Sequence, residues 1–218
     1  MIGILGGSFD PIHIGHLRLA LELYQELGLQ QVRLIPAGAP PHRGAPIASA
    51  QQRLAMVQVA IAGEAGLCAD AREIERGGPS YTVDTLNSLR AELGDTPLGL
   101  IVGMDAFLGL PTWRRWRELF ELAHIIVVHR PGSAVAVTGE LADLFAERHT
   151  DKPQRLAEQA AGHILTWPVS QLDISSTHIR ELLKTGKSIR YLVPDAVAIM
   201  IKASRLYQTE NQHLHTAP

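Results

Sequence analysis

The sequence is poor in cysteine and in net charge, and each shortage excludes a class of protein. Cys68 is the single cysteine among 218 residues, so no disulfide can form within the chain, which fits a reducing compartment. We expect its side chain to be a small buried apolar group. The formal charge of −2 lacks the basic excess that nucleic-acid-binding domains usually carry, so no nucleic-acid partner is expected.

Membrane and targeting segments are lacking as well. No apolar run approaches the roughly 18 residues of a membrane span, and the chain opens on the strand-like MIGIL rather than on a basic segment. We therefore expect a cytoplasmic protein without a membrane partner. With 46% hydrophobic and 19% charged residues, the composition is that of a folded protein, and the length suits one α/β domain.

Short apolar runs alternate along the chain with amphipathic stretches of helical period. The runs are apolar on successive residues, which is typical of parallel strands covered on both faces. Strands are expected at residues 2–5, 31–36, 98–102, 125–129 and 163–167. Helices are expected at residues 17–27, 49–62, 82–93, 138–148 and 176–184, and from Pro194 to about Tyr207. This order predicts an α/β fold, a Rossmann-like, open, mostly parallel sheet with helices on both faces.

We expect a single domain over residues 1–207, including a small C-terminal helical part at about 176–207. The polar tail at 208–218 is expected to be disordered. The segment 37–47 contains three prolines and is the best candidate for a lid. In open parallel sheets ligands bind beyond the carboxyl ends of the strands, so the site is expected there.

The most specific chemistry lies between Gly6 and His16, in GGSFDPIHIGH, which joins an expected strand to an expected helix. Gly6, Gly7 and Gly15 carry no Cβ, so the backbone can turn tightly and approach a ligand. The free amides at a helix start favour an anion, and the imidazoles of His13 and His16 can both donate hydrogen bonds to one phosphate. A histidine near a polyphosphate tends toward its charged form. We therefore predict a phosphate-binding loop.

Two other phosphate-binding loops are absent from the sequence. The Walker pattern GxxxxGK[ST] does not occur. Nor do Gly3, Gly6 and Gly7 have the GxGxxG spacing of dinucleotide-binding domains, which argues against a dehydrogenase.

A second anion site is expected in ISSTHIR, from Ile174 to Arg180. Ser175 or Ser176 is the expected N-cap of the helix that follows, and Arg180 lies in its first turns. Hydroxyl groups, helix-start amides and an arginine can together bind an anion. Taken alone, the segment would be a capped surface helix with an exposed arginine.

Together the two segments resemble the signatures of the nucleotidyltransferase superfamily, GSFDPIHIGH as the first and ISSTxxR as the second. HIGH also resembles a motif of class I aminoacyl-tRNA synthetases, but 218 residues leave no room for tRNA-binding domains. The resemblance implies that His13, His16 and Arg180 are catalytic. It implies an ATP site formed by Gly6, Gly7, Ser8, Phe9, His13, Gly15, His16, Asp105, Ile174, Ser176, Thr177 and Arg180.

The middle of the chain resembles the bacterial nicotinate-mononucleotide adenylyltransferases. The matching segments are 36–43, 79–85, 103–105, 110–113 with Trp116, and 191–194. Arg43 departs from the pattern, since the family usually has lysine there, and the two cations differ in geometry. A pyridine ring needs a stacking partner, for which Trp113 is favoured over Trp116. The resemblance implies a nicotinate mononucleotide site formed by Gly7, Ser8, His42, Arg43, Ser80, Tyr81, Thr82, Asp105 and Trp113.

The implied reaction is adenylyl transfer from ATP to nicotinate mononucleotide, which yields nicotinate adenine dinucleotide and pyrophosphate. Mg²⁺ is expected to enter with ATP, held by substrate oxygens and water rather than by a protein metal site. Three alternatives remain open: another small nucleotidyltransferase such as a phosphopantetheine adenylyltransferase, a nucleotide-binding module without chemistry, and a structural or interaction protein. The sequence gives no expectation for the oligomeric state.

Overall fold

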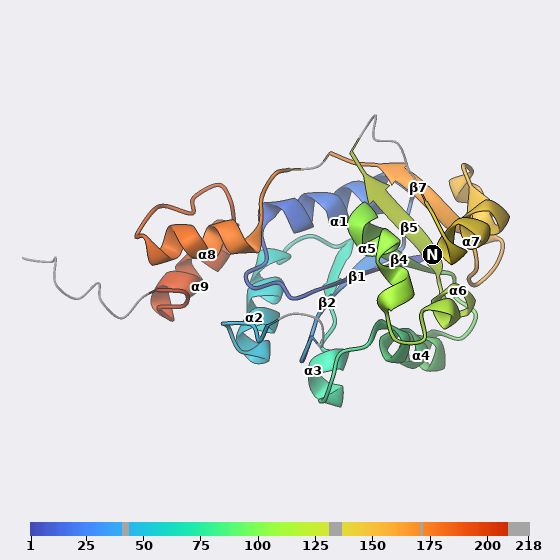
Figure 1. Cartoon of the computed structure of the whole chain (residues 1–218). Coiled ribbons are helices and arrows are strands. Elements are labelled where there is room, and N and C mark those ends of the chain that lie inside the picture. Colours follow the sequence, from blue (N-terminus) through green and yellow to red (C-terminus); the bar gives the residue numbers. More distant parts are fainter. Residues whose placement is uncertain (41–43, 131–136, 171, 209–218) are drawn as a thin grey trace, which may run out of the picture.

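The computed structural model describes residues 1–40, 44–130, 137–170 and 172–208 (Figure 1). These residues form a seven-stranded sheet in the order β3-β2-β1-β4-β5-β7-β6, with every neighbouring pair parallel. The strands are β1 (Ile2–Gly7), β2 (Gln31–Pro36), β3 (Leu67–Ala69), β4 (Leu98–Gly103), β5 (His124–His129), β6 (His149–Thr150) and β7 (Ile164–Pro168). The predicted fold class is therefore confirmed, with a sheet that is parallel throughout.

All five predicted strands are present, with ends that differ from the prediction by two residues or fewer. The sequence did not reveal β3 and β6, the two edge strands. They contain three and two residues, too few to show an apolar run.

Helices connect the strands along the chain. They are α1 (Ile14–Glu26), α2 (Ala50–Ala60), α3 (Arg72–Arg76), α4 (Thr82–Leu93), α5 (Met104–Leu108), α6 (Leu119–Leu122), α7 (Glu140–Arg148), α8 (Ser176–Lys184) and α9 (Asp195–Ala203). Short 3-10 helices occupy Leu110–Thr112, Trp116–Glu118 and Pro153–Ala157. The predicted bounds of α4 and α8 are confirmed, whereas α3, α5 and α6 were missed because four or five residues are too few to show helical periodicity. No described helix is long and apolar enough to cross a membrane.

The prediction that the last helix reaches about Tyr207 is wrong. Helix α9 ends at Ala203, and the chain then turns through positive φ angles at Arg205 (52°) and Tyr207 (66°). This turn carries the Tyr207 side chain into the protein, where it is only 5% exposed. An apolar spacing that continues past a helix end does not reveal such a turn.

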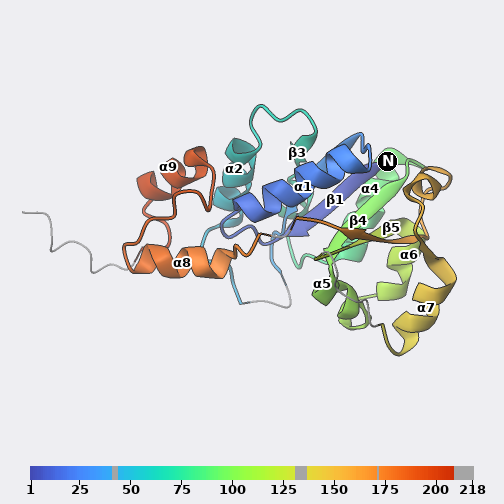
Figure 2. The same ribbon diagram turned by 90° about the horizontal axis from the view of Figure 1, so that it is seen from above.

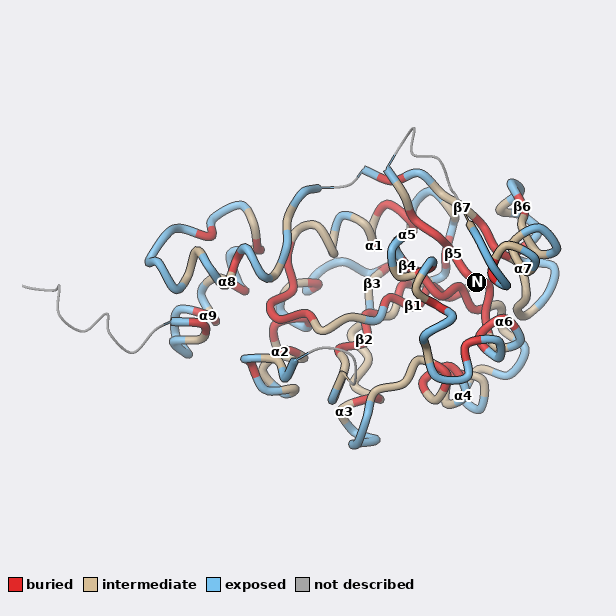
Figure 3. The backbone as a smooth tube through the Cα atoms, in the orientation of Figure 1, coloured by how far each residue is buried: buried red, intermediate tan, exposed pale blue. Residues whose placement is uncertain are grey.

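Two hydrophobic clusters cover the two faces of the sheet. Helices lie on both sides of the sheet (Figure 2), and the central strands are largely buried (Figure 3). Along β5, Ile126 and Val128 pack into the cluster shared with α1, α2, α8 and α9, while Ile125 and Val127 pack into the cluster shared with α4 to α7. Successive side chains of a strand point to opposite faces. A strand that is covered on both faces must therefore be apolar at every position, which explains the uninterrupted apolar runs.

The prediction that Cys68 is buried is wrong, because its side chain is exposed. Cys68 lies at the middle of β3, an edge strand that pairs only with β2. Its neighbours Leu67 and Ala69 pack against the core, so Cys68 points to the opposite face. At the sheet edge that face is left open to solvent.

The strand order places a crevice beside β1 and β4. From β1 the chain moves outward to β2 and β3, and it then returns to β4 on the other side of β1. The connections that follow β1 and β4 therefore lead to opposite sides, toward β2 and toward β5. This leaves an opening at the carboxyl ends of β1 and β4, the usual ligand position in such sheets. Gly7 ends β1 and Gly103 ends β4, so both glycines border this opening.

Candidate active site

A cleft of about 1590 Å³ lies at the carboxyl ends of β1, β4, β5 and β7, between the starts of α1, α4 and α8. Single drug-sized ligands occupy pockets of about 300–1,000 Å³, so this cleft has room for two nucleotides. Its lining includes every predicted site residue that the structure describes: Gly6, Gly7, Ser8, Phe9, His13, Gly15, His16, Ser80, Tyr81, Thr82, Asp105, Trp113, Ile174, Ser176, Thr177 and Arg180. His42 and Arg43 lie outside the described residues, as do the tail residues 209–218.

The two histidines of the first motif lie face to face at the start of α1. His13 is the N-cap residue, and His16 lies in the first turn, because α1 begins three residues earlier than the sequence predicted. Their ring centroids are 3.6 Å apart, and the edge of Phe9 packs on His16 at 5.0 Å. A Cβ at Gly15 would lie only 3.1 Å from the His13 ring, so a side chain at this position would disturb the stack.

Burial favours the uncharged form of His13 at neutral pH. Its side chain is almost entirely buried, and this burial lowers the pKa of the imidazole to about 4. Its Nδ1 is buried and receives or donates no hydrogen bond among the described residues. Buried polar atoms are nearly always hydrogen-bonded, so an unsatisfied nitrogen at the wall of a cleft suits a position that a ligand completes.

The second motif joins the first directly. Ser175 is the N-cap of α8, where its side chain accepts a hydrogen bond from His178 N at 3.2 Å. Ser176 Oγ donates to the carbonyl of Pro11 at 2.8 Å, and Arg180 Nη1 donates to the carbonyl of Asp10 at 2.7 Å. Two sequence segments at opposite ends of the chain therefore form one wall of the cleft.

Asp10, which the sequence did not single out as a site residue, is buried and accepts several hydrogen bonds. Its carboxylate accepts hydrogen bonds from Ile47 N at 2.9 Å, Ala48 N at 3.1 Å and Tyr207 Oη at 2.7 Å. Burial and the hydrogen bond to Asp10 raise the pKa of Tyr207 far above its ordinary value, so the phenol keeps its proton and donates it. Nothing in the local sequence of Asp10 indicates these distant partners.

Arg53 of α2 is a second buried connector that was missed. Its side chain is 1% exposed, and it donates to the carbonyls of Ser8 at 2.7 Å, Ala37 at 2.6 Å and Ala48 at 3.2 Å. Burial lowers the pKa of its guanidinium, although Asp10 nearby opposes this effect. The sequence does contain a sign that Arg53 is buried. It lies three and four residues before Met56 and Val57, so it shares the buried face of the helix with them.

At the other end of the cleft, the segment before α4 is tied to the segment after β2. Ser80 Oγ accepts hydrogen bonds from Gly38 N at 2.9 Å and Ala39 N at 3.2 Å. This hydroxyl oxygen thus positions the cleft wall, and its contact with a ligand stays a prediction. Tyr81 is the N-cap residue of α4, and its side chain makes no capping hydrogen bond. Tyr81 and Thr82 both line the cleft.

Trp113 and Trp116 lie in different surroundings. Trp113 is half-buried and lines the cleft, whereas Trp116 is 7% exposed and packs against Phe120 in the core. Arg114, which follows Trp113, also lines the cleft, with its guanidinium carbon 4.6 Å from the centroid of the Tyr81 ring. Sequence reasoning did not single out Arg114.

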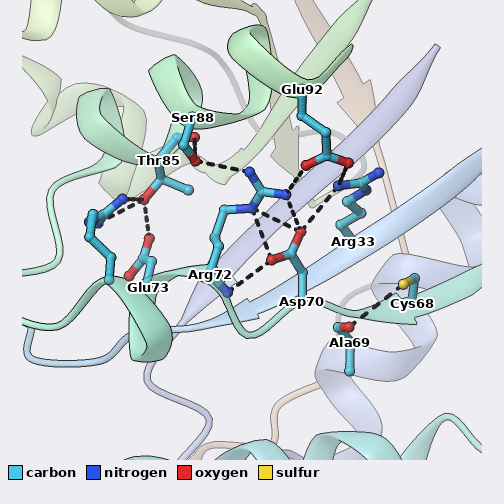
Figure 4. A network of polar contacts seen from close by, with 10 residues as sticks. Arg33, Cys68, Ala69, Asp70, Arg72, Glu73, Thr85, Ser88 and Glu92 are labelled. Atoms are coloured by element: carbon cyan, nitrogen blue, oxygen red, sulfur yellow. Dashed lines mark hydrogen bonds and ion pairs between the residues drawn. The ribbon is translucent and has the colours of Figure 1, made fainter.

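A network of charged groups holds α4 against the sheet edge (Figure 4). Arg33 of β2 and Arg72 of α3 share the carboxylates of Asp70 and Glu92. Although burial raises it, hydrogen bonds from Arg72 bring the pKa of Asp70 below its ordinary value. The network lies outside the cleft and fixes the helix whose start forms the cleft wall.

The chain is similar in sequence to a known protein family and to named proteins. Residues 4–182 match the model of the cytidylyltransferase-like family. The chain is 51% identical to a protein of Methylococcus capsulatus named "Probable nicotinate-nucleotide adenylyltransferase", over 95% of this chain and 99% of that protein. It is 52% identical to a protein of the same name from Halorhodospira halophila, over 90% of each chain.

Among solved structures, the fold is similar to that of a Plasmodium falciparum nicotinic acid mononucleotide adenylyltransferase in complex with NaAD. The TM-score is 0.71, at 15% sequence identity, and the match covers 94% of this chain and 96% of that one. At this identity the likeness concerns the arrangement of helices and strands.

Proposed function

Because the chain belongs to the cytidylyltransferase-like family and, within it, to the nicotinate-nucleotide adenylyltransferases, we propose that it transfers the adenylyl group of ATP to nicotinate mononucleotide. The products are nicotinate adenine dinucleotide and pyrophosphate. One observation carries the proposal: the two phosphate-binding motifs meet in a single cleft of about 1590 Å³, large enough for both substrates.

The reaction requires no covalent bond between the protein and either substrate. An oxygen of the acceptor 5′-phosphate attacks the α-phosphorus of ATP, and the bond from that phosphorus to the oxygen bridging to the β-phosphate breaks as pyrophosphate leaves. The attacking phosphate is already deprotonated, so no general base is needed. Catalysis then consists of holding the two phosphates in line and stabilising the charge that develops on them.

At the triphosphate end we propose that His13 and His16 donate to the α- and β-phosphate region. Phosphates beside His13 would favour its charged form and so offset the burial that lowers its pKa to about 4. Ser176, Thr177 and Arg180 line the same wall of the cleft and are assigned to the β- and γ-phosphates. Arg180 has five N–H donors, so donation to the carbonyl of Asp10 leaves others for phosphate.

We propose Mg²⁺ as the cation that accompanies ATP. The described residues contain no group of three or more His, Cys, Asp or Glu side chains placed to hold a metal ion. Both carboxylate oxygens of Asp10, the buried acid at the cleft, already accept hydrogen bonds. These residues fit a cation that is held by phosphate oxygens and water. When bound, Mg²⁺ neutralises charge on the phosphates and on the leaving pyrophosphate.

At the acceptor end we propose that Trp113 stacks on the pyridine ring and that the amides of Tyr81 and Thr82 bind its carboxylate. An anion is favoured at the start of α4 because the helix dipole is positive there. Asp105, in the first turn of α5 and exposed in the cleft, is assigned to a ribose hydroxyl. His42 and Arg43 are retained as contacts of nicotinate mononucleotide.

We also propose that residues 1–207 act as one domain, with the C-terminal helices α8 and α9 as part of it. Side chains of both helices belong to the same hydrophobic cluster as α1 and α2. The expected partners are the two small substrates, with no nucleic acid, and the expected location is the cytoplasm.

The test is to incubate the protein with Mg-ATP and one of three acceptors, and to measure released pyrophosphate. The acceptors are nicotinate mononucleotide, nicotinamide mononucleotide and phosphopantetheine. We expect the fastest release with nicotinate mononucleotide. Release with phosphopantetheine alone would assign the protein to a different nucleotidyltransferase, and ATP binding without release in any mixture would indicate a non-catalytic module.

A further inference from the structure

We propose that Arg114 determines the choice between acidic and amide acceptors, because its guanidinium attracts the carboxylate of the pyridine ring. The inference rests on the proposed function, which places that ring between Trp113 and the start of α4. It adds a side-chain cation to a place where the proposal so far has only backbone amides.

The position of Arg114 is defined by its place in the chain and by one aromatic contact. It follows Trp113 directly, and both residues line the cleft. Its guanidinium lies over the ring of Tyr81, 4.6 Å from the ring centroid, a separation at which a cation and an aromatic ring attract each other. Since Tyr81 is the N-cap residue of α4, the guanidinium is held beside the helix start.

The charge of Arg114 is left available for a ligand. The neighbouring arginines are neutralised, because Arg115 pairs with Glu118 and Asp84, and Arg117 pairs with Glu140. Within the described residues, no carboxylate forms an ion pair with Arg114.

The positive end of the α4 dipole adds to the attraction of Arg114 for an anion. Asp84 is the acidic residue in the first turn of α4, and Arg115, which it shares with Glu118, lies 3.7 Å from its carboxylate and offsets part of its charge. The positive end of the helix and the guanidinium of Arg114 therefore act together. A planar guanidinium matches a carboxylate with two parallel hydrogen bonds, whereas an uncharged carboxamide gains no charge attraction from it.

Arg114 could instead attract any negatively charged nucleotide to the mouth of the cleft. Both acceptors carry the same 5′-phosphate, so this role would help the acid and the amide equally. The two roles differ in the ratio of the two specificity constants, which is the quantity to measure.

The experiment compares kcat/KM for nicotinate mononucleotide and nicotinamide mononucleotide, at saturating Mg-ATP and fixed ionic strength, in the wild type and Arg114→Gln. We expect kcat/KM to fall about tenfold for the acid, as loss of a partly screened charge-assisted hydrogen bond would cause, and to change less than about twofold for the amide. Arg114→Lys keeps the charge without the planar fork and should retain part of the preference.

Arg117→Gln is the matched control. Arg117 also lies over an aromatic ring, 4.7 Å from the centroid of Trp116, but it does not line the cleft. Its substitution should leave the acid-to-amide ratio unchanged, and the KM for ATP should stay constant in all variants.

An unchanged ratio in Arg114→Gln, whether both constants fall together or neither falls, would overturn the role of Arg114 and leave the proposed function standing. If the wild type released no pyrophosphate with either pyridine mononucleotide, the proposed function would fail and this inference with it. The wild-type measurement therefore separates the two failures.

Discussion

At the scale of single residues, His13 and His16 lie in different surroundings although three positions separate them. His13 is buried at the N-cap of α1, and its burial keeps it neutral until pH falls to about 4. His16 is half-buried in the first turn and stacks on the His13 ring at 3.6 Å. His16 is thus the more accessible of the two donors, and the His13 ring packs against the face of the His16 ring.

We expect His16→Ala to lower kcat by roughly 10²–10³-fold, the usual loss when one donor to a transition state is removed. His178→Ala is the control, because His178 lies on α8, is exposed and does not line the cleft. Steady-state release of pyrophosphate gives both values. A kcat for His16→Ala equal to that of His178→Ala would remove His16 from the catalytic residues.

At the scale of elements, three segments are held together by Asp10. The segment that leads into α2 donates the amides of Ile47 and Ala48, and the segment after α9 donates the hydroxyl of Tyr207. Since Asp10 lies between β1 and α1, the C-terminal segment is fastened to the phosphate-binding loop. This connection explains why the chain turns back after α9.

We expect Tyr207→Phe to lower the free energy of unfolding by about 2 kcal/mol, because it removes a buried hydrogen bond to a charged group. Urea unfolding measures this loss. The control is Tyr191→Phe, since Tyr191 is 75% exposed and its ring contact with Arg190 survives the change. Equal stabilities of the two variants would show that the Tyr207 hydroxyl contributes nothing to the fold.

At the scale of the whole molecule, buried histidines make stability depend on pH. Burial lowers the pKa of His13 to about 4 and also lowers the pKa of His124, which is fully buried at the start of β5. In the unfolded chain both histidines titrate near their ordinary value of about 6.5. Below that pH the unfolded chain takes up protons that the folded protein does not, so stability is complete above about pH 6.5 and declines as pH falls.

We therefore expect the free energy of unfolding to be lower at pH 5 than at pH 7.5, with about 2 kcal/mol of the difference due to His13. Urea unfolding at the two pH values measures it, and pH 5 lies above the range in which most carboxylates titrate. The difference should shrink in His13→Asn and in His124→Asn. A difference that both variants leave unchanged would mean that other groups cause the pH dependence.

The fold class, the five long strands and both phosphate-binding motifs were predictable because each depends on a signal within a short stretch. Strands β1 and β5 are apolar at successive positions since both faces of the sheet are covered, and the N-cap serine of α8 lies beside the residues that it serves. Segments of two to five residues, such as β3 and α5, carry no period and were missed.

The sequence by itself therefore determined the type of sheet, the two motifs and the family. Only the tertiary structure decided that Asp10 binds Tyr207, that Arg53 joins two loops, that Cys68 faces solvent and that Arg114 lies over Tyr81. The physical reason is the distance along the chain between the partners. A hydrogen bond between residues 10 and 207 leaves no trace in local spacing, and it forms only once the sheet has brought the two ends of the chain together.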